Sequence, residues 1–249
     1  MNSVNSDNRI LGFIPARGGS KGLANKNISI FQDHPLIAWP IEYAKRSRLD
    51  MDIVVSTDSS EIADVAKKYG ALVPFMRTQE VSGDLTTTEE TLQFSLRKTE
   101  EILNKTYDLC CFLTCTDLFR KAGWIEHAYN QMNLDPGLDS VFVGNKTHKN
   151  FWQSDEDSYF RLASWMKIYS SRQIRKPVFR EDTGLTCMSK SELWRNKKRI
   201  GDNILIIEDD RFETSIDIHS KFDLKLANLV FDMLKNERPK DLPPIPNKV

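Results

Sequence analysis

The residues best suited to chemistry lie in a short glycine-rich segment near the start of the chain, between positions 16 and 27. This segment holds three glycines and three cationic side chains: Gly18, Gly19, Gly22, Arg17, Lys21 and Lys26. Because glycine has no Cβ, such a backbone can adopt positive φ and bring its N–H groups close to an anion, while the cations supply charge. The segment therefore predicts a phosphate-binding loop. The alternative is an ordinary turn between a strand and a helix.

The order of these residues excludes two common phosphate motifs. The Gly-x4-Gly-Lys-Ser/Thr order of a Walker loop is missing, and so is the Gly-x-Gly-x-x-Gly spacing of a dinucleotide site. The charge of the chain also limits the classes of partner that it can bind, because its 35 basic and 35 acidic residues cancel over 249 residues. A neutral chain offers no overall field for nucleic acid or an anionic membrane, so we expect neither partner and only local anion binding.

The elements that position the loop follow from hydrophobic periodicity, because short apolar runs alternate with longer amphipathic ones. Strands are predicted at residues 10–15, 53–56, 72–75, 109–113, 140–143, 185–188, 204–207 and 215–218. Helices are predicted at residues 36–47, 60–69, 88–103, 124–132 and 221–235. This alternation predicts an α/β fold with a mainly parallel sheet covered on both faces. The loop would then lie beyond the carboxyl end of the first strand, where such sheets bind ligands.

The alternation is interrupted between residues 146 and 183, where aromatic side chains interleave with lysine and arginine. Stacking on nucleic acid would use such a pattern, but it is also typical of subunit interfaces, and the neutral chain favours that second interpretation. We therefore divide the chain into a nucleotide-binding part (1–145), a dimerisation excursion (146–183), a C-terminal part of the same domain (184–238) and an extended tail (239–249).

Two further observations bear on location and redox state. The first eight residues lack the apolar core of a signal peptide, and no run of about 18 apolar residues occurs, so we expect a cytoplasmic protein without membrane contact. The four cysteines, Cys110, Cys111, Cys115 and Cys187, include no Cys-x-x-Cys pair. We expect them to be packed, reduced thiols rather than disulfides or a zinc site.

Several segments resemble one enzyme family. They are Ile14–Asn27, Pro35–Trp39, Val54–Asp58, Glu61–Gly70 and, near the end, Ser215–Leu224. These segments, about half of the chain in all, are similar to the acylneuraminate cytidylyltransferases, the CMP-sialic acid synthetases and their relatives. The resemblance implies a Rossmann-like three-layer nucleotidyltransferase domain, usually homodimeric. Such a domain joins CTP to an acidic ulosonic sugar, releases pyrophosphate and uses Mg²⁺ as cofactor.

The resemblance also assigns roles to residues. Loop positions that correspond to nucleotide contacts are Ala16, Arg17, Gly18, Gly19, Ser20, Lys21 and Asn27, among which Arg17 and Lys21 would stabilise phosphate charge during transfer. Arg77 and Asp84 match further nucleotide positions, and Thr116 and Arg120 match positions on the sugar side. Arg172 and Arg180 match arginines of the excursion, where a forked guanidinium would suit a sugar carboxylate. For Arg77, Asp84, Arg172 and Arg180 the alternative is a solvated surface or loop position.

The chain departs from the family at two places. Where the family reads Gln-Pro-Thr-Ser-Pro-Leu-Arg, this chain has Thr114-Cys-Thr-Asp-Leu-Phe-Arg120; in the metal-binding element, Asp217 is the first acid but His219 replaces the second. Mg²⁺ prefers oxygen ligands, and imidazole suits transition metals better. We expect Asp217 to be catalytic and to hold the metal with Asp117, which would supply the missing carboxylate, and with His219. The alternative is that Asp117 caps a helix beginning near Lys121.

These departures, together with an altered strand at Thr183–Met188, leave the exact activity open. The sugar could be sialic, legionaminic or pseudaminic acid, or a shorter octulosonate. A nucleotide-binding paralogue that has lost turnover and serves as a partner subunit is one alternative function. A nucleotidyltransferase for another base or another sugar is a second, because a fold alone does not determine chemistry.

Overall fold

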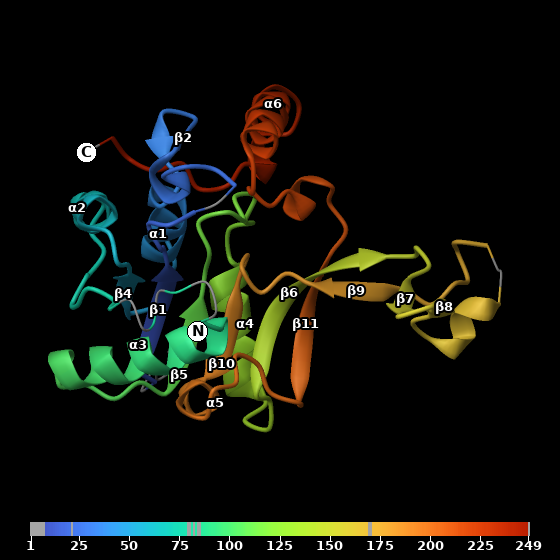
Figure 1. Ribbon diagram of the computed structural model, residues 1–249, viewed down its shortest axis with the longest axis horizontal. Helices are drawn as coiled ribbons and strands as arrows, with labels where there is room; N and C mark the ends of the chain where they lie inside the picture. The colour runs from blue at the N-terminus through green and yellow to red at the C-terminus, as the bar shows by residue number, and fades with distance from the viewer. Residues whose placement is uncertain are drawn as a thin grey trace, which may run out of the picture.

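The structure is a computed structural model that describes residues 8–20, 22–78, 81, 83, 86–168 and 171–248 (Figure 1). Its centre is a seven-stranded sheet. The strands are β1 (Ile10–Pro15), β4 (Met51–Ser56), β5 (Leu109–Phe112), β6 (Ser140–Thr147), β9 (Val178–Glu181), β10 (Cys187–Lys190) and β11 (Ile204–Asp209). They lie in the order β11-β6-β10-β5-β1-β4, with β9 also paired to β6.

Most strands of this sheet run in one direction. β1 is parallel to β4 and to β5, and β6 is parallel to β11. β10 is antiparallel to both β5 and β6, so those two neighbours share a direction, and β9 is antiparallel to β6. The predicted α/β class with a mainly parallel sheet is confirmed. Because β1, β4 and β5 are parallel neighbours, the loops that follow them meet at one edge.

Helices cover both faces of the sheet, as Figure 1 shows. They are α1 (Ala38–Lys45), α2 (Ser60–Lys68), α3 (Thr88–Leu103), α4 (Trp124–Leu134), α5 (Ser191–Arg195) and α6 (Lys221–Glu237). The alternation of β1 assigns them to layers, since successive side chains of a strand point to opposite faces. Ile10 and Ile14 pack in the core built with α1, α2, α4 and α6, whereas Leu11 and Phe13 pack with α3 and α5.

Capping residues define where two of the long helices begin. Thr87 and Glu90 form a capping box at the start of α3, and Ser220 and Asp223 form one at the start of α6. In each box a hydroxyl accepts a backbone N–H of the first turn and a carboxylate accepts the N–H of the cap residue. The second box directly follows the segment that contains Asp217, so the start of α6 is held beside it.

Two predicted strands are not formed. Residues 72–75 lie beside β4. Leu72 forms backbone hydrogen bonds with Ile53 and Val55, and Met76 forms a bridge with Thr57. Pro74, which has no N–H, prevents a continuous ladder between these two contacts. Residues 215–218 follow the short 3-10 helix η4 (Glu213–Ser215) and make one isolated bridge, between Asp217 and Asp117. Both segments are extended backbone that touches the body of the fold at single points.

Smaller elements complete the chain. β2 (Ile30–Phe31) and β3 (His34–Pro35) form a hairpin between the glycine-rich segment and α1. The excursion contains the hairpin of β7 (Trp152–Asp155) and β8 (Ser158–Arg161) and the 3-10 helix η3 (Ser164–Lys167), and it extends away from the sheet on the right of Figure 1. The C-terminal segment packs back on the domain, where Arg46 Nη2 donates to the carbonyl of Ile245 at 2.8 Å. Among the described residues, no helix is long and apolar enough to cross a membrane.

Candidate active site

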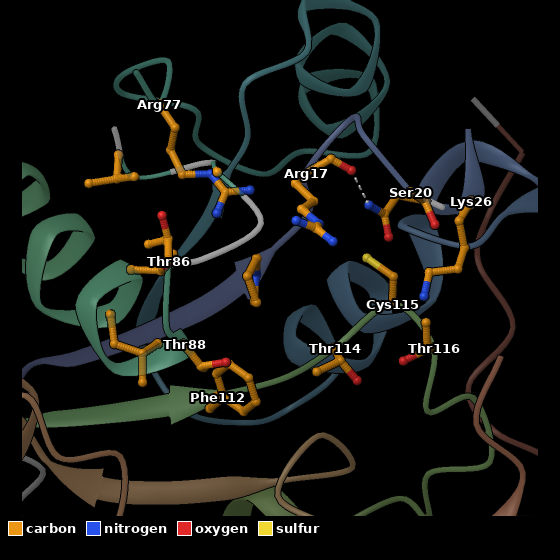
Figure 2. A pocket seen from close by; sticks show the side chains of 16 residues that line it. Arg17, Ser20, Lys26, Arg77, Thr86, Thr88, Phe112, Thr114, Cys115 and Thr116 are labelled. Atoms are coloured by element: carbon orange, nitrogen blue, oxygen red, sulfur yellow. Dashed lines mark hydrogen bonds between the residues drawn. The ribbon is translucent and has the colours of Figure 1, made fainter. Parts of the chain in front are cut away.

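A cavity of about 410 Å³ lies at the carboxyl ends of β1 and β5, which contribute Pro15 and Phe112 to its wall. The loop after β1 adds Arg17, Ser20, Lys26 and Asn27, the loop after β5 adds Thr114, Cys115 and Thr116, and the segment before and within α3 adds Thr86, Thr88, Thr91 and Leu92. Arg77 closes one side (Figure 2). The cavity therefore occupies the place in the sheet where the sequence predicted a ligand.

Three cationic side chains surround this cavity, since Arg17, Lys26 and Arg77 extend toward the same space in Figure 2. Arg77 is only 8% exposed, and its Nε and Nη2 have no hydrogen-bond partner among the described residues. Burial lowers the pKa of Arg77, as does the positive charge of Arg17, while the charge of Asp58 opposes that shift. Buried guanidinium groups are normally paired, so this arrangement is complementary to an anionic ligand.

The loop after β1 is held by hydrogen bonds within itself and to residues at the end of β4 and just beyond it. Ala16 is fully buried and donates its N–H to the carbonyl of Ser56 at 2.9 Å, and Asn27 Nδ2 donates to the carbonyl of Arg17 at 2.8 Å. The N–H of Gly18 donates to Asp58 Oδ1 at 2.7 Å, and the N–H of Ser20 donates to the carbonyl of Gly18 at 3.0 Å. Two of the amides expected to face phosphate are thus engaged within the protein, and side chains supply most of the charge.

Two glycines of the loop lie where other segments pack closely against it. Among the described residues, positive φ occurs at Asn25 in this loop and not at Gly18 or Gly19. A Cβ on Gly22 would collide with the carbonyl oxygen of His219, and one on Gly18 would lie 3.1 Å from the Cβ of Ser59. Gly22 and Gly18 therefore permit close approach between segments.

A pair of carboxylates lies at the end of the loop that carries Thr116. Asp117 and Asp217 face each other in an antiparallel bridge, and the N–H of Ile218 donates to the carbonyl of Thr116 at 3.3 Å. Burial and the charge of Asp217 raise the pKa of Asp117 to about 6, although the Thr114 hydroxyl donates a hydrogen bond to it. Two carboxylates held this close repel each other, which favours a shared cation or proton.

Each carboxylate of this pair has a distinct neighbour: Gly184 lies against Asp117, and His219 contacts Asp217. A Cβ on Gly184 would collide with Asp117 Oδ2, so glycine at this position leaves that carboxylate its place. His219 Nε2 lies 2.8 Å from Asp217 Oδ2, so the imidazole is hydrogen-bonded to that carboxylate. No group of three or more His, Cys, Asp or Glu side chains in the described part of the chain could hold a metal ion by itself.

Asp117 does not cap the following helix, which was the alternative interpretation. α4 begins at Trp124, and its N-cap is Gly123, which makes no side-chain cap hydrogen bond.

The cysteines are free and buried, as expected, and burial raises the pKa of each thiol.

The remaining predicted site residues do not all lie at the cavity. Arg120 is 1% exposed and donates to the carbonyls of Leu185, Thr114 and Gly184 at 2.7, 2.5 and 2.7 Å, so it holds the loop after β5 and does not line the cavity. Arg180 Nε donates to Asp182 at 2.6 Å, and Asp117 and Asp217 contribute to raising its pKa, which puts it within electrostatic reach of the carboxylate pair. Arg172 is exposed in the excursion and is not among the residues that line the cavity. Lys21 and Asp84 lie outside the described residues.

Sequence reasoning missed several residues of the site. Thr86, Thr88 and Thr91 line the cavity, and the run of threonines before an amphipathic helix was the signal that could have identified them. Asp182 was missed as well; it is buried, its pKa is raised by that burial, and it holds Arg180. Its only signal in the sequence was an acid two residues after an arginine.

A parallel sheet with a cationic cavity and a carboxylate pair at its carboxyl edge defines a nucleotide-binding α/β protein of the nucleotidyltransferase class. A family model described as "Cytidylyltransferase" matches residues 11–177, and the chain belongs to that family. It is 30% identical to CMP-N,N'-diacetyllegionaminic acid synthase of Legionella pneumophila over 90% of this chain and 97% of the relative. It is 28% identical to N-acylneuraminate cytidylyltransferase of Escherichia coli over 94% of this chain and 54% of the relative.

A solved structure shares the fold. CMP:2-keto-3-deoxy-manno-octonic acid synthetase, determined in complex with CTP, superposes with a TM-score of 0.66 at 15% identity and covers 90% of this chain and 99% of that one. The Rossmann-like architecture implied by the sequence resemblance is thus confirmed, and the chain is a nucleotidyltransferase of the cytidylyltransferase family.

Proposed function

We propose that this cytidylyltransferase transfers CMP from CTP to an acidic ulosonic sugar and releases pyrophosphate. The observation that carries the proposal is the convergence of Arg17, Lys26 and a buried, incompletely paired Arg77 on one cavity beside the Asp117–Asp217 pair. The names of the relatives from Legionella pneumophila and Escherichia coli, which specify a CMP-legionaminic acid synthase and an acylneuraminate cytidylyltransferase, support the same substrates.

The cations would act on the triphosphate. In nucleotidyl transfer a sugar hydroxyl attacks the α-phosphorus, and negative charge gathers on the phosphate oxygens and on the departing pyrophosphate. Arg17, Arg77 and Lys26 offer N–H donors from different sides of one cavity, so they can neutralise several phosphate oxygens at once. Lys21, in the same loop, remains a predicted contact. The threonines and Phe112 at the α3 end of the cavity suit the ribose and the base.

The carboxylate pair fits Mg²⁺. Asp117 and Asp217 are oxygen ligands, and Mg²⁺ commonly binds through one or two carboxylates while substrate phosphates and water complete its octahedron. The raised pKa of Asp117 indicates a local excess of negative charge that a cation would relieve. When bound, Mg²⁺ would supply positive charge beside the reacting phosphate. His219 would orient Asp217 through their hydrogen bond instead of acting as a third ligand.

The sugar and the partner subunit would approach from the excursion side. Arg180, held by Asp182 and close to the carboxylate pair, is the candidate for the sugar carboxylate, which a guanidinium binds well. The excursion exposes a group of large apolar side chains: Phe151, Trp152, Tyr159, Phe160, Leu162, Ile168 and Ile174. Exposed aromatic and aliphatic groups on a projecting element suit a homodimer interface, and a cytoplasmic location suits the reduced thiols.

A pyrophosphate-release assay tests the proposal. The protein is incubated with Mg²⁺, with each nucleoside triphosphate in turn and with sialic, legionaminic, pseudaminic and octulosonic acids. Release with CTP and one of these acids is expected. CTP binding without release would indicate a paralogue that has lost turnover, and release with another nucleotide would indicate a different nucleotidyltransferase.

A pair of arginine variants tests the site itself. Arg77→Ala should raise the KM for CTP by about tenfold to a hundredfold, because a lost hydrogen bond to a charged group costs about 1.5–3 kcal/mol. Arg48→Ala is the matched control, since Arg48 precedes the amino end of β4 at the opposite edge of the sheet. An equal effect of the two variants would contradict the assignment of the cavity.

A further inference from the structure

Asp58 has no role in the proposed reaction, yet it touches the phosphate loop directly. It lies two residues beyond the end of β4 and is exposed, and its Oδ1 accepts the N–H of Gly18 at 2.7 Å. A hydrogen bond from an amide to a carboxylate is stronger than one between neutral groups. Because Gly18 follows Arg17, this contact connects the end of β4 to the loop that carries a cation of the cavity.

The neighbouring residue holds the backbone of Arg77 in a similar way. The carbonyl of Thr57 accepts the N–H of Arg77 at 2.8 Å, and Thr57 also forms a parallel bridge with Met76. Residues 57 and 58 therefore contact both arginine-bearing segments, one through the backbone and the other through a side chain. The side-chain contact is the one that a substitution can remove.

Charge reinforces this connection. Arg17 and Arg77 face the same cavity, and the positive charge of Arg17 lowers the pKa of Arg77. The carboxylate of Asp58 acts on Arg77 in the opposite direction. An acidic group at this point offsets the repulsion between two like charges before any ligand arrives.

We propose that Asp58 is a positioning residue for the triphosphate: it holds Gly18, and through it Arg17, in the place where Arg17 and Arg77 act on one ligand. Asp58 itself contacts none of the reacting atoms. This inference rests on the proposed function, because it takes CTP as the ligand. It predicts that the side chain of Asp58 contributes to binding of the phosphates and not to binding of the nucleoside.

Binding measurements on substituted proteins test this role. Asp58→Ala removes the acceptor and should weaken CTP binding, measured by calorimetry, about tenfold, the effect of losing one positioning hydrogen bond. Asp58→Asn keeps an oxygen acceptor for Gly18 but lacks the negative charge, so its CTP affinity should lie between that of Asp58→Ala and that of the unsubstituted protein. Cytidine binding and the KM for the sugar should be unchanged in both variants. Asp58→Ser, whose side chain is too short to reach Gly18, provides a second measurement if the alanine variant folds poorly.

The adjacent residue provides a matched control. Ser59 caps α2 by accepting the N–H of Ile62, so Ser59→Ala perturbs the same turn and leaves the contact between Asp58 and Gly18 in place. It should lower thermal stability without weakening CTP binding. Unchanged CTP affinity in Asp58→Ala and Asp58→Ser would overturn the positioning role while the proposed function stands. Absence of CTP binding by the unsubstituted protein would instead overturn the proposed function.

Discussion

Asp117 and Asp217 face each other across a backbone bridge, although they belong to segments far apart in the sequence. The bridge places a carboxylate from the loop after β5 beside one from the segment before α6. In the sequence, His219 stands where the resemblance led us to expect a second acid. The structure brings Asp117 beside Asp217, and our proposal is that Asp117 takes the place of that acid.

The first prediction concerns the stability of the metal-free protein. The folded-state pKa of Asp117 is raised to about 6 from a reference value of 3.8. Ionisation of this carboxyl therefore destabilises the folded protein progressively as pH rises between these two values, and the full cost is present above pH 6. Asp117→Asn should therefore increase the free energy of unfolding by about 1–3 kcal/mol at pH 8, and the gain should shrink as pH falls from 6 toward 4. Urea unfolding at several pH values measures it.

The same substitution should remove the response to Mg²⁺. Loss of one of two carboxylate ligands should lower activity at limiting Mg²⁺ by about a hundredfold, and Asp217→Asn should do the same. A stability gain of equal size at pH 5 and pH 8 would show that the charge of Asp117 does not destabilise the folded protein. Unchanged metal affinity would show that Asp117 is not a ligand.

A second prediction separates structural from substrate-binding arginines. Arg120→Ala leaves the carbonyls of Thr114, Gly184 and Leu185 without their donors in the interior, and it should destabilise the protein by about 3–5 kcal/mol. Arg180→Ala should cost less than about 1 kcal/mol, because its side chain is half exposed. Denaturant midpoints measure both. Similar stability of the two variants would mean that Arg120 does not hold the loop.

A third prediction concerns the close approach of Gly22 to His219. Gly22→Ala forces a Cβ against the carbonyl oxygen of His219 and should displace the segment that carries Asp217. We expect kcat/KM to fall by more than about tenfold, since small misplacements of catalytic groups are costly. Gly19→Ala is the comparison in the same loop, because a Cβ there meets no atom within 4 Å and the backbone N–H that would face the nucleotide is kept. Comparable activity of the two variants would refute the packing argument.

A fourth prediction tests the excursion as a homodimer interface. Tyr159 is 77% exposed on β8, and Tyr159→Asp should place a charge in the interface and shift the protein from dimer toward monomer in sedimentation experiments. Leu134 is similarly exposed, at 76%, at the end of α4, and Leu134→Asp should leave the dimer intact. A monomeric unsubstituted protein, or dissociation only by the Leu134 variant, would exclude this interface.

Local patterns were sufficient for much of the fold. β1 and α3 lie at their predicted bounds, because a short apolar run and a long amphipathic segment with a capping box carry their own signals. Residues 72–75 and 215–218 were wrongly predicted as strands. Whether such a segment pairs depends on the neighbour that it meets, and Pro74 or a preceding 3-10 helix limits each of them to isolated contacts.

The sequence by itself determined the α/β class, the cationic loop at Arg17 and the candidate carboxylates, since these depend on residue types and short spacings. Only the tertiary structure decided which of them lie together. It brought Asp117 to Asp217, turned Arg120 inward to backbone carbonyls, and used Gly22 for close packing against His219. These relationships depend on long-range contacts across the edge of the sheet, where strand order and loop packing, not local periodicity, set the distances between side chains.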